Sequence, residues 1–203
     1  MKIVCIGRNY VKHVQELNNE IPGEPIFFLK PDTALLPKGQ AFYIPGFSSD
    51  IHHEIEIVLR ICKEGKNISE EFASRYYDAL TIGIDFTARD IQQKQKEKGL
   101  PWEPAKAFDH SAPVGSIVSL DDLKDRNNIA FHLDVNGKTV QKGNSTLVIY
   151  SFEKIISYVS KFITLRKGDL VFTGTPEGVG QVKPGDLLEC YLEDKCLLKV
   201  KVK

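Results

Sequence analysis

Short apolar runs, each closed by turn residues, recur along this chain of 203 residues and limit the folds that it can adopt. Four of these runs cover residues 3–6, 26–29, 54–61 and 79–85. They are rich in β-branched side chains, which favour strands. Asn136 and Gly137 separate two further runs, and this dipeptide favours a hairpin with a type I′ turn. The pattern therefore predicts many short strands rather than a helical bundle.

Helical signals are fewer, and they do not alternate regularly with the strands. Apolar spacing and capping residues predict helices over residues 11–18, from 69 onward, over 87–98 and over 151–162. Thr87 and Asp90 resemble a capping box at the start of the third helix. We therefore expect an α+β fold, rich in β-structure, with curled, mostly antiparallel sheets and a few peripheral helices. The length suits a single domain over residues 1–203.

Charge and composition exclude several classes of protein. Lys and Arg total 27 and Asp and Glu total 27, so the chain lacks the excess positive charge of a nucleic-acid-binding protein. No run of 18 apolar residues occurs, so we expect no membrane-spanning helix. A pI near 7.0 permits self-association. The four cysteines form no C-x-x-C pair, and we expect them to be small apolar residues in a reducing, cytoplasmic location.

Glu54 and Glu56 form the sharpest local signal. In a strand, residues two apart point to the same face, with about 6.5 to 7 Å between them. Both carboxylates can then reach one hard cation, for which Mg²⁺ is the best fit. The alternative is a solvated strand face. Asp85 ends an apolar run directly before a helix, which is a common place for a ligand residue, and a turn or capping role is its alternative.

Two lysines lie among apolar neighbours. Lys106 follows Trp102 and precedes Phe108, so it is a candidate for a partly buried electrophile or proton donor. The alternative is a surface lysine whose aliphatic stem covers apolar residues. Lys30 has the same two interpretations.

His13 and Glu16 stand three residues apart in a predicted helix, so their side chains can meet. A carboxylate that orients an imidazole builds a general base, and an ordinary contact on a helix surface is the alternative. The glycine-rich loop over residues 173–180 lacks the Gly-Lys-Ser/Thr pattern of a P-loop, which argues against nucleotide binding. Its backbone N–H groups can still approach a carboxylate closely.

Six motifs follow one another along nearly the whole chain. They are GRNY with His13 (7–13), FLKP (28–31), HEIE (53–56), GIDFTARDIQ (83–92), Trp102 with KAFD (106–109), and TGTPEGVG (173–180). In this order they resemble the fumarylacetoacetate hydrolase family, and most closely its small acylpyruvase and oxaloacetate decarboxylase branch.

The resemblance implies the family's mixed β-roll, a homodimer, and specific roles for several residues. Glu54, Glu56 and Asp85 match the family's ligands for Mg²⁺ or Mn²⁺. Lys106 matches its active-site lysine. Four positions match residues that face the substrate: Arg8, Lys30, Gln92 and Thr175. His13 and Glu16 match a catalytic dyad on a mobile lid, here about residues 10–20.

The activity that the resemblance implies is metal-dependent cleavage of a C–C bond in small 2-oxo acids. Acylpyruvate hydrolysis and oxaloacetate decarboxylation would both pass through a pyruvate enolate held at the metal. One alternative is an isomerase or hydratase of dienoic diacids on the same site. A second is a catalytically silent, dimeric binding protein.

Overall fold

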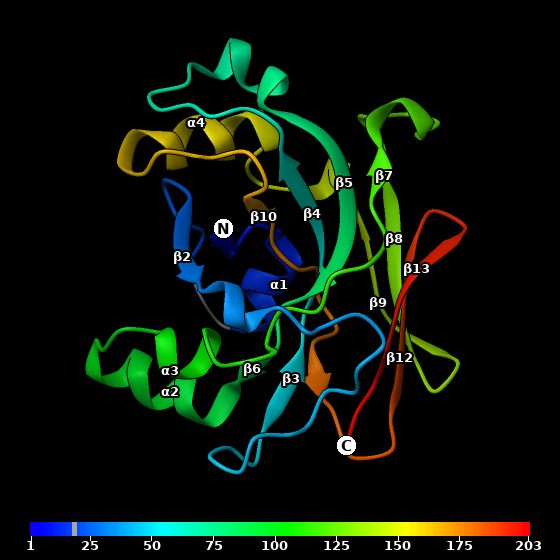
Figure 1. The fold of residues 1–203 in the computed structure, drawn as a ribbon. Helices are drawn as coiled ribbons and strands as arrows, with labels where there is room; N and C mark the ends of the chain where they lie inside the picture. Colours follow the sequence, from blue (N-terminus) through cyan, green and yellow to red (C-terminus); the bar gives the residue numbers. More distant parts are fainter. Residues whose placement is uncertain (18–19) are drawn as a thin grey trace.

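The computed structural model describes residues 1–17 and 20–203, which form three β-sheets with helices around them (Figure 1). In sheet order, the largest sheet consists of β2 (Ile26–Lys30), β1 (Ile3–Gly7), β10 (Leu170–Phe172), β4 (Ile55–Ile61), β5 (Tyr77–Ile84) and β7 (Val118–Ser119). Its neighbouring strands run antiparallel except for the parallel pair of β1 and β10. The predicted β-rich, mostly antiparallel architecture is confirmed.

Both faces of this sheet are buried, which explains why its central strands are almost wholly apolar. On one face, Ile57 and Leu59 of β4 join the main core, to which α4 (Phe152–Phe162) also contributes. On the other face, Val58 packs with Phe172 and with the segments around Ala34 and Ala112.

Gly83 of β5 has no side chain, and the Phe172 and Val58 side chains on the second face of the sheet occupy the space beside it. A Cβ atom there would lie 2.7 Å from Phe172 Cε1 and 2.9 Å from Val58 Cγ2, and both neighbours are fully buried. We therefore expect Gly83→Ala to lower the free energy of unfolding by about 1–3 kcal/mol through overpacking. Gly23→Ala is the matched control, because no atom lies within 4 Å of its Cβ position. Equal thermal melting of the two variants would contradict this packing.

Two smaller sheets complete the fold. One contains β11 (Gly180–Gln181), β3 (Ile51–His53) and β6 (Thr87–Ala88). The other contains β13 (Lys195–Lys201), β12 (Leu187–Leu192), β8 (Ala130–Val135) and β9 (Lys138–Asn144). Asn136 and Gly137 have φ values of 52° and 77°, which confirms the type I′ turn between β8 and β9. β13 lies at a sheet edge, where its alternation of apolar and lysine residues suits a half-exposed strand.

The helices lie outside the sheets (Figure 1). They are α1 (Val11–Glu16), α2 (Arg89–Lys98), α3 (Glu103–Lys106) and α4, with 3-10 turns at Asp32–Ala34, Glu70–Tyr76, Leu120–Asp122 and Ser145–Leu147. Ser151 caps α4, because its side chain accepts a hydrogen bond from the Lys154 N–H. Within the described ranges, no helix is both long and apolar enough to cross a lipid bilayer.

Three helix predictions need correction. The segment after Ser69 is a 3-10 helix, and the Ser69 side chain makes no capping hydrogen bond. The capping box at Thr87 is wrong, because Thr87 belongs to β6 and α2 starts at Arg89 without a side-chain cap. The Thr87 hydroxyl instead contacts Lys106, a residue that local sequence reasoning cannot place there. The first helix ends at Glu16, and position 18 of the predicted range lies outside the described residues.

Candidate active site

Three buried carboxylates meet where the largest sheet joins the three-stranded one. Glu54 lies at the junction of β3 and β4, Glu56 on β4, and Asp85 directly after β5. The antiparallel pairing of β4 and β5 carries Asp85 beside Glu54, whose carbonyl oxygen accepts a hydrogen bond of 2.8 Å from the Asp85 N–H. One carboxylate oxygen from each residue lies within 4.8 Å of the others. The three side chains converge as predicted. The exposed fractions of Glu54, Glu56 and Asp85 are 5%, 2% and 1%, so they do not form a solvated strand face.

Two carboxylates of this cluster are neutralised by two buried lysines and a half-buried arginine. Lys106 Nζ lies 2.8 Å from Glu54 Oε2 and 2.7 Å from Asp85 Oδ2. Arg89 Nη2 lies 2.5 Å from Glu54 Oε1, and Lys30 Nζ lies 2.7 Å from Asp85 Oδ1. Burial alone would raise the pKa of Glu54, but Lys106 and Arg89 hold it below its usual value. Lys106 and Lys30 are therefore not surface lysines.

Lys106 keeps its charge although it is buried. Burial would lower the pKa of Lys106, but the attraction of Asp85 and Glu54 outweighs that effect and raises it. Its amine also donates a hydrogen bond of 2.6 Å to the Thr87 hydroxyl. The structure thus places a charged ammonium group within contact of two of the three carboxylates.

Glu56 lacks such compensation. Among the described residues it has no ion-pair partner, and Oε2 accepts a hydrogen bond of 2.6 Å from the Gly174 N–H. Burial, followed by repulsion from Asp85, raises the pKa of Glu56 well above its usual value. Gly174 has a φ of 102°, a conformation that favours glycine and turns its N–H toward this carboxylate.

This cluster fits a divalent cation. Asp85 Oδ1 is buried and makes no hydrogen bond, although the Lys30 amine lies 2.7 Å from it as an ion-pair partner. Glu56 forms no ion pair with any described side chain, so the protein itself offers no cation to balance its carboxylate. Hard carboxylate oxygens are the ligands that Mg²⁺ and Mn²⁺ prefer. Glu54, Glu56 and Asp85 are therefore suited to hold either ion.

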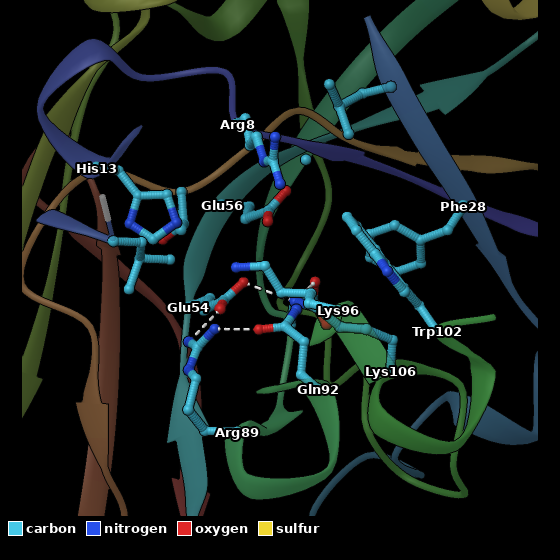
Figure 2. A pocket seen from close by; sticks show the side chains of 15 residues that line it. Arg8, His13, Phe28, Glu54, Glu56, Arg89, Gln92, Lys96, Trp102 and Lys106 are labelled. Atoms are coloured by element: carbon cyan, nitrogen blue, oxygen red, sulfur yellow. Dashed lines mark hydrogen bonds and ion pairs between the residues drawn. The ribbon is translucent and has the colours of Figure 1, made fainter. Parts of the chain in front are cut away.

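A pocket opens above the cluster, and most of the predicted site residues line it (Figure 2). The predicted residues in its wall are Arg8, His13, Glu54, Glu56, Asp85, Gln92, Lys106 and Thr175. Lys30 and Glu16 lie one layer behind it, where they contact Asp85 and His13. Arg8 adopts a φ of 59°, a strained conformation of the kind that clusters at functional sites.

The helix α1 closes over one side of this pocket. His13 Nδ1 lies 3.2 Å from Glu16 Oε2, so the predicted contact between the two side chains is present. Glu16 Oε1 also accepts a hydrogen bond from the Gly178 N–H, which ties the helix to the glycine-rich loop. A carboxylate oxygen can only accept, so His13 Nδ1 is the donor in this contact, and Nε2 of the neutral ring has the lone pair. The pair has the arrangement of a general base and its orienting carboxylate.

Sequence reasoning did not assign two cationic residues of the pocket wall, Arg89 and Lys96. With Gln92 they stand three and four residues apart on α2, so one helix face carries all three. Figure 2 shows these side chains near Glu54, and Arg89 Nη1 donates to Gln92 Oε1 at 2.6 Å. Burial, with repulsion from Arg8 and Arg89, lowers the pKa of Lys96. This spacing was the only signal in the sequence that could have grouped the three residues. It does not identify a site, because a charged helix face is more often exposed to solvent.

Comparisons with known proteins show the family to which the chain is related. The family profile described as "Fumarylacetoacetate (FAA) hydrolase C-terminal" matches residues 2–203. The mitochondrial oxaloacetate tautomerase of Bos taurus is 42% identical over 200 residues, which are 98% of this chain and 90% of that protein. The mitochondrial oxaloacetate decarboxylase of Dictyostelium discoideum is 45% identical over 190 residues, which are 93% and 87% of the two chains.

A solved structure extends the likeness to three dimensions. The fumarylpyruvate hydrolase of Pseudomonas aeruginosa, crystallised with Mn²⁺ and pyruvate, superposes with a TM-score of 0.93 at 37% identity, over 100% of this chain and 89% of that one. Sequence and fold therefore agree over nearly the entire length. The chain belongs to the fumarylacetoacetate hydrolase family.

Proposed function

We propose that the protein is a metal-dependent enzyme that cleaves a C–C bond in small 2-oxo acids. The observation that carries this proposal is the buried cluster of Glu54, Glu56 and Asp85 beside the charged Lys106. Such a cluster is costly to bury for structural reasons alone, because Glu56 has no cationic partner among the described residues. Relatives named oxaloacetate decarboxylase and fumarylpyruvate hydrolase support the same class of substrate.

The three carboxylates would hold Mg²⁺ or Mn²⁺, which supplies a Lewis acid for the negative charge of an enolate. The ammonium group of Lys106 stabilises the same developing charge and can deliver a proton to the carbanion carbon. Lys30 lies outside the pocket wall and holds Asp85 in place through an ion pair. The Lys30 amine is itself held by a hydrogen bond of 2.9 Å that it donates to the Ser111 hydroxyl.

The dyad on α1 adds the step that hydrolysis requires. His13 Nε2 takes a proton from water, whose oxygen attacks the distal carbonyl of an acylpyruvate. The C–C bond then breaks, so that the acyl group leaves as a carboxylic acid and the pyruvate part as an enolate. Oxaloacetate loses CO₂ without any attack by water. We propose that residues 10–20 act as the lid that carries this base.

Three further residues are proposed to bind the substrate. Arg8 and Gln92 line the pocket on opposite sides of the carboxylates, and Thr175 lies on the glycine-rich loop. Guanidinium, amide and hydroxyl groups are suited to hold a substrate carboxylate and its 2-oxo group.

A substrate panel tests the proposed function. Purified protein with Mg²⁺ is assayed for hydrolysis of acylpyruvates, decarboxylation of oxaloacetate and isomerisation of dienoic diacids. We expect turnover of at least one 2-oxo acid in the first two groups. Turnover of the dienoic acids alone would replace the proposal with the isomerase alternative, and no turnover of any would favour a binding protein.

A second candidate activity is interconversion of the keto and enol forms of oxaloacetate. The Bos taurus relative is named an oxaloacetate tautomerase, which favours this activity. The same pocket offers three carboxylates for a cation and Lys106 as a proton donor. Tautomerisation needs one proton to leave carbon and another to reach oxygen, without C–C cleavage. Ultraviolet absorbance of the enol, followed beside CO₂ release, separates the two reactions.

Metal binding is expected to depend on Glu56. Glu56→Gln keeps the shape of the side chain but removes its charge, so we expect the affinity for Mg²⁺ to fall by about tenfold or more. Isothermal titration calorimetry measures this change. Glu71→Gln, at an exposed position, is the matched control. If Glu56→Gln binds Mg²⁺ as tightly as the unmodified protein, Glu56 is not one of the metal ligands.

Two features drawn from the sequence remain predictions. We propose that the protein is a homodimer and that it works in the cytoplasm. Sedimentation velocity measures the first, and a single species with the monomer mass of 22.8 kDa would contradict it.

A further inference from the structure

Gln141 is a buried side chain whose amide links four groups around the site. It lies on β9, in the four-stranded sheet, and is 1% exposed. Its Oε1 lies 2.9 Å from His53 Nδ1 and accepts a hydrogen bond of 3.1 Å from the Ile55 N–H. Its Nε2 donates to Thr175 Oγ1 at 2.9 Å and to the Pro176 carbonyl oxygen at 3.0 Å. The amide therefore joins both neighbours of Glu54 to the glycine-rich loop.

The partners of Gln141 fix which way its amide points. A backbone N–H can only donate and a carbonyl oxygen can only accept, so Ile55 selects the Oε1 side and Pro176 the Nε2 side. His53 Nδ1, opposite Oε1, must then carry a proton.

The close approach of β9 to the loop makes this contact possible. Gly178 has a φ of 93°, and a Cβ atom there would lie 2.3 Å from the Val140 carbonyl oxygen. Any other residue at this position would push the strand that carries Gln141 away from the loop. Gly178 therefore lets the loop lie close enough to β9 for the Gln141 amide to contact Thr175 and Pro176.

The orientation of the amide has a consequence for Thr175. Because Gln141 Nε2 donates to Thr175 Oγ1, the threonine proton must point elsewhere. In the described part of the chain, no hydrogen bond is donated by that hydroxyl, and Thr175 lines the pocket. We propose that Gln141 is a positioning residue that turns the Thr175 hydroxyl into a hydrogen-bond donor toward the carboxylate of a 2-oxo acid. This inference rests on the proposed function.

The decisive variant is Gln141→Glu, which keeps the shape and the two contacts of Oε1. When this carboxylate is ionised, its second oxygen cannot donate, so the Thr175 hydroxyl would donate to it and present a lone pair to the bound carboxylate. Losing one hydrogen bond to a charged acceptor weakens binding by roughly 10- to 100-fold. We expect this rise in the Kd of pyruvate, measured by calorimetry with saturating Mg²⁺. We expect a similar rise in KM and a much smaller change in kcat.

A double-mutant cycle distinguishes positioning from general structural damage. Thr175→Val removes the hydroxyl and is expected to weaken pyruvate binding to a similar extent. Gln141→Glu added to Thr175→Val should then weaken binding no further, because the group that it misdirects is gone. Thr175→Ser, which keeps the hydroxyl, should bind pyruvate like the unmodified protein. Additive losses in the double variant would overturn the proposal.

Two controls make each outcome decisive. Should Gln141→Glu fail to fold, Gln141→Met takes its place in the cycle, since it keeps the length of the side chain and removes the donor. Pyruvate binding without turnover of any 2-oxo acid would reject the proposed function while the cycle still measures the coupling of Gln141 and Thr175. Absence of pyruvate binding by the unmodified protein would overturn the inference about Gln141 and Thr175, whereas the substrate panel decides the proposed function by itself.

Discussion

Replacing Lys106 with methionine is expected to lower turnover of the 2-oxo acid substrate by a factor of about 10² or more. The variant keeps the aliphatic stem but removes the ammonium group that lies 2.8 Å from Glu54 and 2.7 Å from Asp85. Its loss removes a charge from the place where the enolate would develop. The measurement is kcat under saturating substrate and Mg²⁺, with Lys138→Met at an exposed position as control.

The same variant should still fold. Glu54 keeps Arg89 and Asp85 keeps Lys30 as a cationic partner, so neither carboxylate is left fully unpaired. Without Mg²⁺, we expect the variant to melt at a lower temperature than the unmodified protein. With Mg²⁺, the difference between the two melting temperatures should be smaller, because a ligand that binds the folded state stabilises that state. Normal turnover in a folded variant would make Lys106 a structural ion-pair residue only.

Replacing His13 with alanine is expected to affect the two proposed reactions unequally. Acylpyruvate hydrolysis needs an activated water, and loss of a general base typically costs about 10² to 10⁴ in rate. Oxaloacetate decarboxylation needs no such water, so we expect a clearly smaller loss. The measurement is the ratio of the two kcat values in one variant with one metal.

The position of His13 on α1 requires a control for lid closure. Lys12 lies on the same helix and contacts Glu177 of the glycine-rich loop at 3.4 Å, outside the pocket. Lys12→Ala therefore tests the docking of the helix without touching the dyad, and we expect it to affect both reactions equally and weakly. Equal losses of both reactions in His13→Ala would assign His13 to lid closure or substrate binding rather than to base catalysis.

The strand pattern could be predicted from the sequence because its determinants are local. Alternation around Glu54 and Glu56 places both side chains on one face, and the turn at Asn136 and Gly137 requires positive φ at both residues. The helix at 151–162 was predicted from its apolar spacing and from Ser151, which caps it.

Contacts between distant segments could not be predicted in this way. Lys106 contacts Glu54, which lies 52 residues away in the sequence, and the Thr87 hydroxyl accepts a hydrogen bond from Lys106 instead of capping α2. The structure pairs Gln141 of β9 with Leu133 of β8, but the local sequence does not distinguish Gln141 from any other polar strand residue. The family resemblance supplied the roles of the site residues, which neither composition nor periodicity contains.

Turnover before and after removal of the metal tests the central claim most directly. The protein is treated exhaustively with a chelator, assayed with its preferred 2-oxo acid, and assayed again after Mg²⁺ or Mn²⁺ is returned. We predict that turnover disappears on chelation and returns with either ion in the unmodified protein, but not in Glu56→Gln at the same metal concentration. Full turnover by the chelated protein would contradict a metal-dependent site built on Glu54, Glu56 and Asp85.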